Sequence, residues 1–312
     1  MEFNASSAQL LKIEADSLVL PTGSQLENIA KQIDAALDGA ITSLIESGDF
    51  SGKASEACVL RNLNTPFKRI ILVGTDGASN PQKMIKAIEA GASELFKTPA
   101  VNAVWAIEGL AEDHDWQATI VARSTLTAAY QYSGTGKKPK PKKLETVTYW
   151  CASENDSNIA NQGLNYGGAI GNGMNTARQL GNLPANICTP NYLAEQASQL
   201  AEEQANLTTS ILNESEMKKL KMGSLLSVST GSVEPGNLIV MNYTGADSSL
   251  KPIVLVGKAV TFDTGGISLK PGRGMDEMKF DMCGGASVFG VMNALLETKL
   301  PVNVIGIVPA VE

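Results

Sequence analysis

Four charged side chains lie close together in a glycine-rich stretch of the sequence: Lys258, Asp263, Lys270 and Asp281. They follow the apolar run 252–257, whose pattern is that of a strand covered on both faces. Charged groups on loops after such strands are how open α/β sheets often build active sites. Because charges at the edge of a hydrophobic core cost free energy unless they find partners, this pattern predicts an ion-pair network, a phosphate site or a metal site.

Spacing separates these alternatives only in part. A Walker-type phosphate loop is disfavoured because Lys258 is followed by Ala259 rather than Ser or Thr, and the Rossmann glycine fingerprint is absent too. Hard divalent cations prefer carboxylate oxygens, and an amine beside a dication can lose its proton and coordinate it. A second lysine could then stay protonated and polarise a carbonyl. On spacing alone, a metal site and a structural salt-bridge network are equally open.

Composition narrows the class of protein. The length of 312 residues leaves room for two domains, and the formal net charge of −7 disfavours nucleic acid or an anionic membrane as a partner. No apolar run is as long as a membrane helix, and the N-terminus has neither the basic start nor the apolar core of a secretion signal. The four cysteines are far apart in the sequence, without a Cys-x-x-Cys pair, which fits a reducing compartment. We therefore expect a cytoplasmic protein.

The first 150 residues are expected to form an α/β unit. Strand and helix patterns alternate there at a spacing typical of a mainly parallel sheet with helices on its faces. The only histidine, His114, is expected to lie at the solvated N-terminus of a helix rather than to act as a general base. The lysine-rich segment 137–143 is expected to be a solvated surface connection, because its prolines exclude a helix or a central strand. Strands are predicted at 18–20, 69–74, 101–107 and 145–150, and helices at 25–46, 82–96 and 116–132.

A long helix over 158–179 is expected to link this unit to a second α/β region. Its glycines are expected to allow close backbone packing. Thr189 and Pro190 predict the N-cap and first turn of the next helix. The remaining predicted elements are strands at 208–212, 238–243, 253–256 and 302–309, a short helix ending near Met222, and a helix at 283–296.

A longer motif surrounds the charged residues. It reads Gly-Lys-x-x-x-Phe-Asp-x-Gly-Gly-x-Ser-x-Lys-Pro and then Met-Lys-Phe-Asp-Met, with Asn-Thr-Ala-Arg-Gln-Leu-Gly-Asn-Leu-Pro-Ala-Asn upstream at 175–186. The segment resembles the leucine aminopeptidase (cytosol aminopeptidase) family of two-metal exopeptidases, from about residue 160 onward and more loosely before it. The resemblance implies an α/β fold with a macro-like N-terminal domain and a parallel-rich sheet at 1–152. It further implies a linking helix at 153–182 and an α/β catalytic domain, incomplete at its C-terminal end, at 183–312.

The resemblance also implies roles for individual residues. Lys258 and Asp281 would be ligands of the tighter metal site, and Asp263 would bridge two divalent ions, Mn²⁺ or Zn²⁺. Lys270 would be the catalytic lysine that contacts the substrate and polarises its scissile carbonyl, and Met278 would line the pocket for the first side chain. The implied reaction is hydrolysis of an N-terminal residue, leucine or another apolar one, from peptides with a free N-terminus by a metal-bridged hydroxide. The family assembly is a homohexamer.

One family motif has no counterpart in this sequence. It is Asn-Thr-Asp-Ala-Glu-Gly-Arg, which supplies an aspartate, a bridging glutamate and an arginine. With Asp263, Asp281 and Lys258 alone, too many coordination positions of two dications fall to water. The sequence therefore predicts that these 312 residues are a fragment that is not competent alone. Two alternatives are a DNA-binding or architectural role, which only segment 137–143 favours, and a non-catalytic binding role of a truncated family member.

Overall fold

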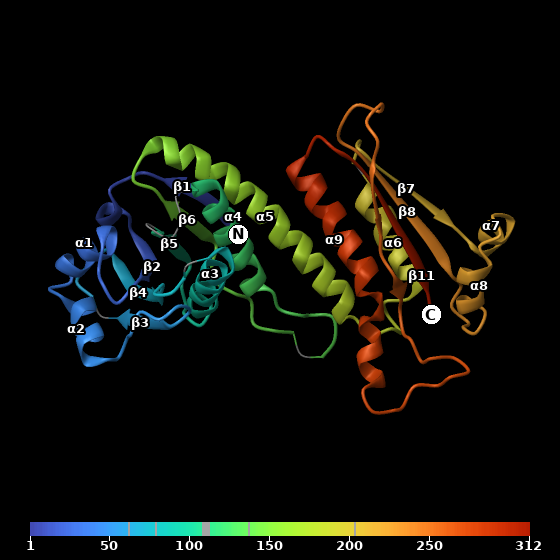
Figure 1. Cartoon of the computed structure of the whole chain (residues 1–312), viewed down its shortest axis with the longest axis horizontal. Helices are drawn as coiled ribbons and strands as arrows, with labels where there is room; N and C mark the ends of the chain where they lie inside the picture. Colours follow the sequence, from blue (N-terminus) through green and yellow to red (C-terminus); the bar gives the residue numbers. More distant parts are fainter. Residues whose placement is uncertain (62, 79, 108–112, 137, 203) are drawn as a thin grey trace. The chain divides into compact units, whose positions relative to one another are not determined.

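The structure is a computed structural model that describes residues 1–61, 63–78, 80–107, 113–136, 138–202 and 204–312 (Figure 1). It divides into two compact units, one formed by residues 1–130 and 140–171 and the other by 131–139 and 172–312. The division falls within helix α5 (Glu154–Asn182), so each unit contains part of this helix. The domain limits expected at 152 and 183 stay a prediction.

The first unit is built on a six-stranded sheet with the strand order β1-β6-β5-β2-β4-β3. All neighbouring strands are parallel except the β3–β4 pair, so the predicted parallel-rich sheet is confirmed. Two strands at the edges of the sheet, β1 and β3, were not predicted; each has only five residues, which is too short for a clear periodic pattern. The strands are β1 (Glu2–Ser6), β2 (Ala15–Thr22), β3 (Ala57–Arg61), β4 (Phe67–Gly74), β5 (Asn102–Trp105) and β6 (Thr146–Trp150).

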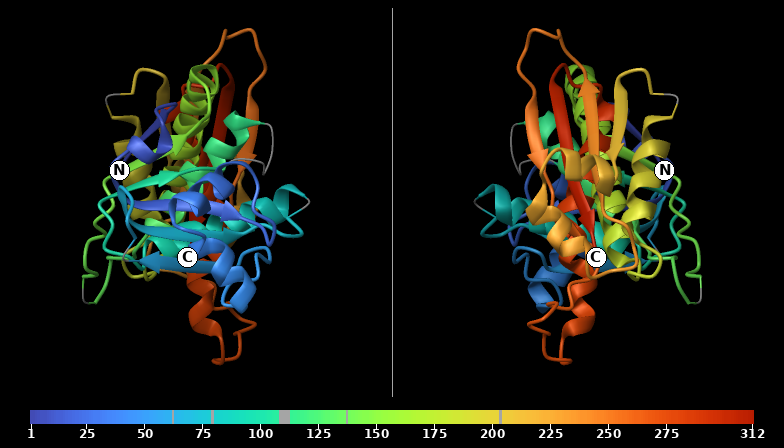
Figure 2. Two further views of the ribbon diagram at one scale, coloured as in Figure 1. Left: turned by 90° about the vertical axis from the view of Figure 1, so that its left-hand side faces the viewer. Right: turned by 90° about the vertical axis from the view of Figure 1, so that its right-hand side faces the viewer.

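Helices cover both faces of this sheet. Along β4, Ile71 and Val73 belong to one buried cluster, whereas Ile70 and Leu72 belong to another, as the alternation of side chains along a strand requires. The left-hand view of Figure 2 looks toward this unit. Its helices are α1 (Asn28–Ala36), α2 (Ala40–Ser47), α3 (Pro81–Leu95) and α4 (His114–Ala129), followed by the first part of α5.

The single helix expected over 25–46 is wrong, because the chain breaks it into α1 and α2. Asp38 and Gly39 adopt left-handed backbone angles, with φ of 53° and 81°. The carboxylate of Asp34 accepts hydrogen bonds from the backbone N–H groups of Ile41 (2.7 Å) and Thr42 (3.1 Å). Asp34 thus satisfies the free N–H groups of α2 from the preceding helix, which stabilises the break.

The glycines of α5 permit close packing, as predicted. A Cβ atom added at Gly163 would lie 2.1 Å from the carbonyl oxygen of Asp115 in α4. Nearer the C-terminus of α5, Gly173 meets Gly290 of α9 in the same way, at 2.4 Å from its carbonyl oxygen. Only a residue without a side chain allows backbones to approach this closely.

The second unit contains a five-stranded mixed sheet. β11 lies at its centre: it pairs in antiparallel fashion with β8, which pairs with β7, and in parallel fashion with both β9 and β10. Helix α9 packs on this sheet through a buried face that includes Phe289 and Met292. The right-hand view of Figure 2 looks toward these strands. The strands are β7 (Leu207–Leu212), β8 (Asn237–Thr244), β9 (Ile253–Val256), β10 (Ala259–Val260) and β11 (Asn303–Val311), and the helices include α6 (Pro190–Ala201), α7 (Glu214–Lys219), α8 (Gly223–Ser229) and α9 (Cys283–Thr298).

Two local predictions in this unit have different outcomes. The predicted cap of α6 is confirmed, since the Thr189 hydroxyl accepts a hydrogen bond from the Tyr192 N–H at 3.2 Å and Pro190 occupies the first turn. The helix expected to end near Met222 ends instead at Lys219. Lys221 has a φ of 58°, which turns the chain, and Met222 then precedes α8.

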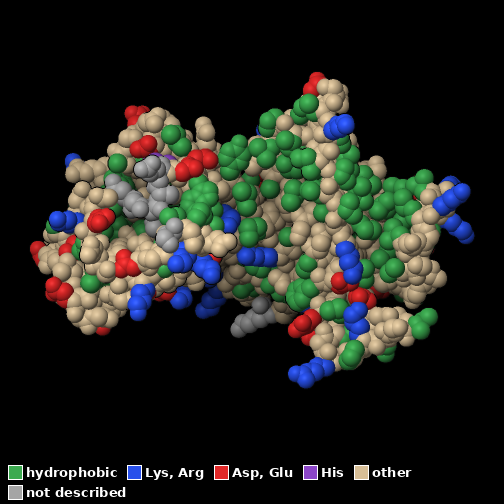
Figure 3. All heavy atoms as spheres, viewed as in Figure 1, with side chains coloured by type: hydrophobic (Ala, Val, Ile, Leu, Met, Phe, Trp, Pro, Cys, Tyr) green, Lys and Arg blue, Asp and Glu red, His purple; other side chains and the backbone are tan. Residues whose placement is uncertain are grey.

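The strand before the charged residues is not covered on both faces, and that prediction is wrong. Ile253, Val254 and Val256 of β9 are 56%, 52% and 69% exposed. Within the described residues β9 pairs with β11 alone, so it is an edge strand. An apolar run does not reveal whether a strand lies at the centre or at the edge of its sheet. Figure 3 shows hydrophobic side chains at the surface over the strands of this unit.

Candidate active site

The charged residues are positioned where the edge of the sheet is interrupted. β9 and β10 are two short strands on the same side of β11, and Gly257 and Lys258 lie between them. The Lys258 carbonyl accepts a hydrogen bond from the Gly285 N–H at 2.7 Å, at the start of α9. A Cβ atom added at Gly257 would lie 2.3 Å from the Gly284 carbonyl oxygen. Two glycines in contact thus bring the interruption and the N-terminus of α9 together.

This crossing places Lys258 beside Asp281. Asp281 lies in the 3₁₀ segment η2 (Met275–Met282), which leads directly into α9. The Lys258 Nζ is 2.6 Å from the Asp281 Oδ2, although the Asp281 side chain is only 22% exposed. The same Oδ2 is buried and has no hydrogen bond of good geometry within the described residues. The contact is therefore an ion pair by distance, and the buried carboxylate oxygen keeps the capacity to bind a cation.

The other two charged residues form a second ion pair. The Lys270 Nζ donates to the Asp263 Oδ2 at 2.5 Å, and the Gly265 N–H donates to the Asp263 Oδ1 at 2.9 Å. The loop between them folds back because Gly265 and Gly266 have φ of 91° and 63°, which favours glycine. The Lys270 N–H closes the loop by donating to the Thr264 carbonyl at 2.9 Å.

Electrostatics joins the two pairs into one cluster. The hydrogen bond from Lys270 is the main reason why the pKa of Asp263 lies below its ordinary value, and the Gly265 N–H adds to it. Burial raises this pKa, though by less than either hydrogen bond lowers it, and Coulombic attraction from Lys270 and from Lys258 makes the smallest contributions, both of which lower it. Because Lys258 is paired with Asp281 and also acts on Asp263, the structure brings all four predicted residues together.

The lowered pKa of Asp263 predicts a dependence of stability on pH. A carboxyl group whose pKa is lower in the folded state stabilises the fold above its unfolded pKa of about 3.9, and this contribution is lost as the pH falls through the folded pKa. Asp263→Asn should therefore lose less unfolding free energy than the unmodified protein between about pH 5 and pH 3. Urea denaturation at each pH measures this, with exposed Asp276→Asn as the control. Equal acid sensitivity of the Asp263 variant and the unmodified protein would contradict the assignment.

The donor types fit a divalent metal site in part. Asp263 and Asp281 offer carboxylate oxygens, and the Lys258 amine could coordinate after losing its proton. Across the described residues, however, no group of three or more His, Cys, Asp or Glu side chains could hold a metal ion. In this structure the lysines pair with the carboxylates, which is also the arrangement of the salt-bridge alternative.

Three other predictions from the sequence concern residues that are not part of this cluster. Met278 is half-buried in η2, and its role in substrate binding stays a prediction. The lysine-rich segment contains neither helix nor strand over 138–143, as expected, and Lys137 is outside the described residues. His114 is the first residue of α4, as expected, but it is not fully solvated: its side chain is 25% exposed, and its Nδ1 lies 3.2 Å from the hydroxyl of buried Tyr149. Burial raises the pKa of Tyr149, so this tyrosine stays neutral.

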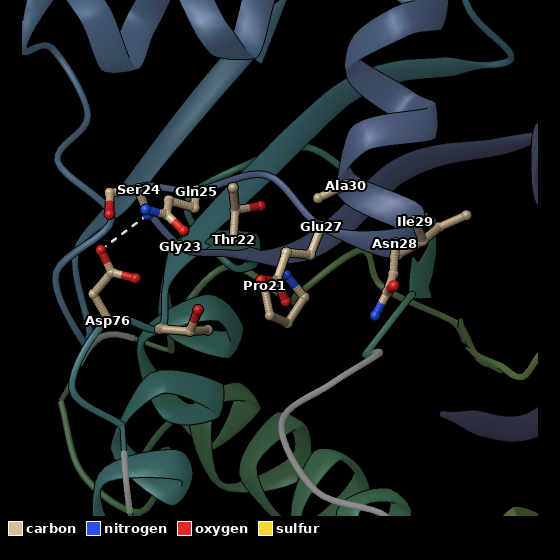
Figure 4. Close-up of a pocket in the computed structure, with 11 residues that line it drawn as sticks. Pro21, Thr22, Gly23, Ser24, Gln25, Glu27, Asn28, Ile29, Ala30 and Asp76 are labelled. Atoms are coloured by element: carbon tan, nitrogen blue, oxygen red, sulfur yellow. Dashed lines mark hydrogen bonds between the residues drawn. The ribbon is translucent and has the colours of Figure 1, made fainter.

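A polar cavity of about 260 Å³ in the first unit was not predicted from the sequence (Figure 4). It lies at the carboxyl ends of β2 and β4, beside the start of α1, and two of its lining residues are joined by a hydrogen bond from the Ser24 N–H to the Asp76 carboxylate at 2.9 Å. Its lining of hydroxyl, amide and carboxylate groups includes none of the predicted site residues. The surrounding sequence contains no motif that could have identified it.

The second unit belongs to the class of α/β proteins that carry a polar cluster at a sheet edge, here two lysines and two carboxylates. The family models named "Cytosol aminopeptidase family, catalytic domain" and "Cytosol aminopeptidase family, N-terminal domain" match residues 175–312 and 18–139. The chain belongs to the cytosol aminopeptidase family.

Individual relatives agree with this assignment. The chain is 41% identical to a probable cytosol aminopeptidase of Nitrosococcus oceani and 40% identical to the cytosol aminopeptidase of Pseudomonas aeruginosa. Both matches cover 100% of this chain but only 64% and 65% of those proteins. Among solved structures, a mutant of tomato leucine aminopeptidase is 26% identical with a TM-score of 0.84, over 100% of this chain and 63% of that one. The bottromycin maturation enzyme BotP in complex with Mn shares the fold, at 24% identity and a TM-score of 0.77, over 96% of this chain and 60% of that one.

Proposed function

We propose that this protein is a metal-dependent aminopeptidase that removes the N-terminal residue, preferentially leucine or another apolar residue, from peptides. The observation that carries the proposal is the cluster of Lys258, Asp263, Lys270 and Asp281, which lies within the segment matched by the family's catalytic domain. The names of the relatives support the same activity.

The cluster would hold the metal ions through three of its members. Asp263 and Asp281 would contribute carboxylate oxygens, and Lys258 would contribute its amine once it leaves the ion pair with Asp281. Divalent ions, Mn²⁺ or Zn²⁺, would supply an acidified water and polarise the scissile carbonyl. The Asp281 Oδ2 supports this assignment, because it is buried and has unused capacity as an acceptor.

Lys270 would be the catalytic residue of this chain. Its side chain is 34% exposed and is held by Asp263, so the amine is oriented yet reachable by a substrate. A protonated amine beside the carbonyl oxygen stabilises the negative charge that develops there during hydrolysis. Met278, on η2 near Asp281, would contact the side chain of the N-terminal residue.

A direct assay tests the proposal. A protein that carries this sequence within the full length of its relatives should release leucine from a leucyl amide in the presence of Mn²⁺, and a chelator should abolish the activity. An N-acetylated leucyl amide should not be cleaved, because the free α-amine is required. The 312 residues alone should be inactive, because two carboxylates and one amine cannot fill the coordination of two dications. Cleavage that survives complete metal removal would overturn the proposal.

Four further expectations stay predictions. They are the homohexameric assembly, the cytoplasmic location, the absence of a membrane partner and the absence of a nucleic-acid partner. Among the described residues, no helix combines the length and apolar character needed to cross a membrane. Among the residues that the structure describes, no specific contact favours a DNA-binding or a non-catalytic binding role.

A further inference from the structure

The segment that carries Asp281, η2, has few interactions of its own that stabilise its conformation. η2 is an eight-residue 3₁₀ stretch, whereas such helices rarely exceed three or four residues because their hydrogen-bond geometry is poor. It begins after Gly274 without a side-chain cap, and Met282 is its only buried residue. A segment of this kind needs contacts from elsewhere to fix the direction of its side chains.

Lys279 supplies one such contact from the middle of η2. Its Nζ donates to the backbone carbonyl of Asn182 at 3.4 Å and lies 4.9 Å from the centre of the Phe280 ring. Asn182 is the last residue of α5, and it belongs to the motif at 175–186, which ends about seventy residues before the motif that begins at Gly257. The contact therefore joins the two motifs that mark the family in this sequence.

The C-terminus of α5 is a favourable place for the Lys279 cation. The last carbonyl groups of a helix lack partners within the helix and carry partial negative charge, which a cation stabilises. α5 has no basic residue in its own last turn. Lys279 provides the cation from a distant part of the chain, and its side chain is half-buried rather than free in solvent.

The geometry of a 3₁₀ helix lets Lys279 and Asp281 act in different directions. With 3.0 residues per turn, residues two apart point to different sides of the helix. On one side of η2, the Lys279 Nζ donates to the Asn182 carbonyl at the end of α5. On another side, the Asp281 Oδ2 lies 2.6 Å from the Lys258 Nζ. Both contacts lie within the second unit.

We propose that Lys279 is a positioning residue, which anchors η2 on the C-terminus of α5 and so directs the Asp281 carboxylate toward Lys258 and the metal. The metal part of this inference rests on the proposed function, but the anchoring does not. Loss of a partner bonded directly to a metal ligand typically weakens metal binding by about 10- to 100-fold, and Lys279 acts one contact further away, so the lower end of this range applies. Lys279→Met should therefore weaken Mn²⁺ binding by about tenfold.

The test uses a protein that carries this sequence within the full length of its relatives, with two readouts, Mn²⁺ titration and hydrogen exchange of the amides in 275–282. Lys279→Met should weaken Mn²⁺ binding and speed exchange in η2, whereas Lys279→Arg should restore both because it keeps the cation. Exposed Lys219→Met is the matched control and should change neither. Asp281→Asn should also weaken Mn²⁺ binding. Unlike Lys279→Met, it should not speed amide exchange in η2.

The outcomes separate the anchoring from the metal site. If the unmodified protein and Asp281→Asn bind Mn²⁺ equally, the metal assignment fails, and the exchange data alone decide whether Lys279 anchors η2. If Lys279→Met leaves exchange in η2 and Mn²⁺ binding unchanged, Lys279 has no positioning role and the inference is overturned. An effect of Lys279→Met that Lys279→Arg does not rescue would also overturn it, because the cation would not be the cause.

Discussion

Replacement of Lys270 by alanine is expected to lower kcat by about 10²- to 10³-fold while metal affinity changes little. The size of the loss is that seen when one group that stabilises a developing oxyanion is removed. In the structure the Lys270 amine is bound only to the Asp263 carboxylate among the described contacts, at 2.5 Å, so it is available to turn toward a substrate carbonyl. Removal of this amine leaves both carboxylates and Lys258 in place, and with them the proposed metal ligands.

The measurement needs a protein of the relatives' length that has been shown to cleave a leucyl amide. kcat and Mn²⁺ affinity are then determined for Lys270→Ala and for Lys251→Ala, whose exposed side chain lies outside the cluster. The Lys251 variant should keep its full kcat. If Lys270→Ala loses metal affinity in proportion to its rate, Lys270 is a structural partner of Asp263 rather than a catalytic group.

Whether a segment forms a helix or a strand could be predicted from the sequence better than its position in the sheet. The apolar runs of β4 and β11 and the helix of α9 were predicted correctly because each is buried by its neighbours and shows this in its pattern. β9 has a similar apolar pattern but is an edge strand, since only pairing partners distant in the sequence decide which strands are central. The break between α1 and α2 depends on the left-handed residues Asp38 and Gly39 and on the Asp34 carboxylate, which accepts hydrogen bonds from the start of the next helix.

The candidate site shows the same limit. Spacing could not distinguish a salt-bridge network from a metal site, and in the structure the four residues form two ion pairs. These alternatives are compatible in physical terms. Carboxylates that are prepared for a dication repel each other in its absence, and a lysine beside each one offsets that repulsion. The pairing of Lys258 with Asp281 would then hold the site in a folded state until a metal replaces the ammonium charge.

A large loss of stability is expected from Gly257→Ala, at the crossing that positions Lys258. The added Cβ atom would lie 2.3 Å from the Gly284 carbonyl oxygen, 2.6 Å from its carbonyl carbon and 2.7 Å from the Val288 Cγ2. Backbone atoms cannot move aside as a flexible side chain can, so the edge of the sheet and the start of α9 must separate. Overpacking of this kind costs about 1–3 kcal/mol and occasionally more. We expect a loss of about 3 kcal/mol of unfolding free energy.

Gly272→Ala is the matched control for this variant, because no atom lies within 4 Å of its added Cβ and its φ is not left-handed. Its unfolding free energy should stay within about 0.5 kcal/mol of the unmodified protein. Urea denaturation of both variants measures the difference, and Mn²⁺ titration shows whether the displaced Lys258 also weakens the proposed metal site. A Gly257→Ala protein as stable as the control would show that the crossing has room to relax. A destabilised variant that still binds Mn²⁺ normally would mean that the glycine contact supports the fold but does not position Lys258 against Asp281.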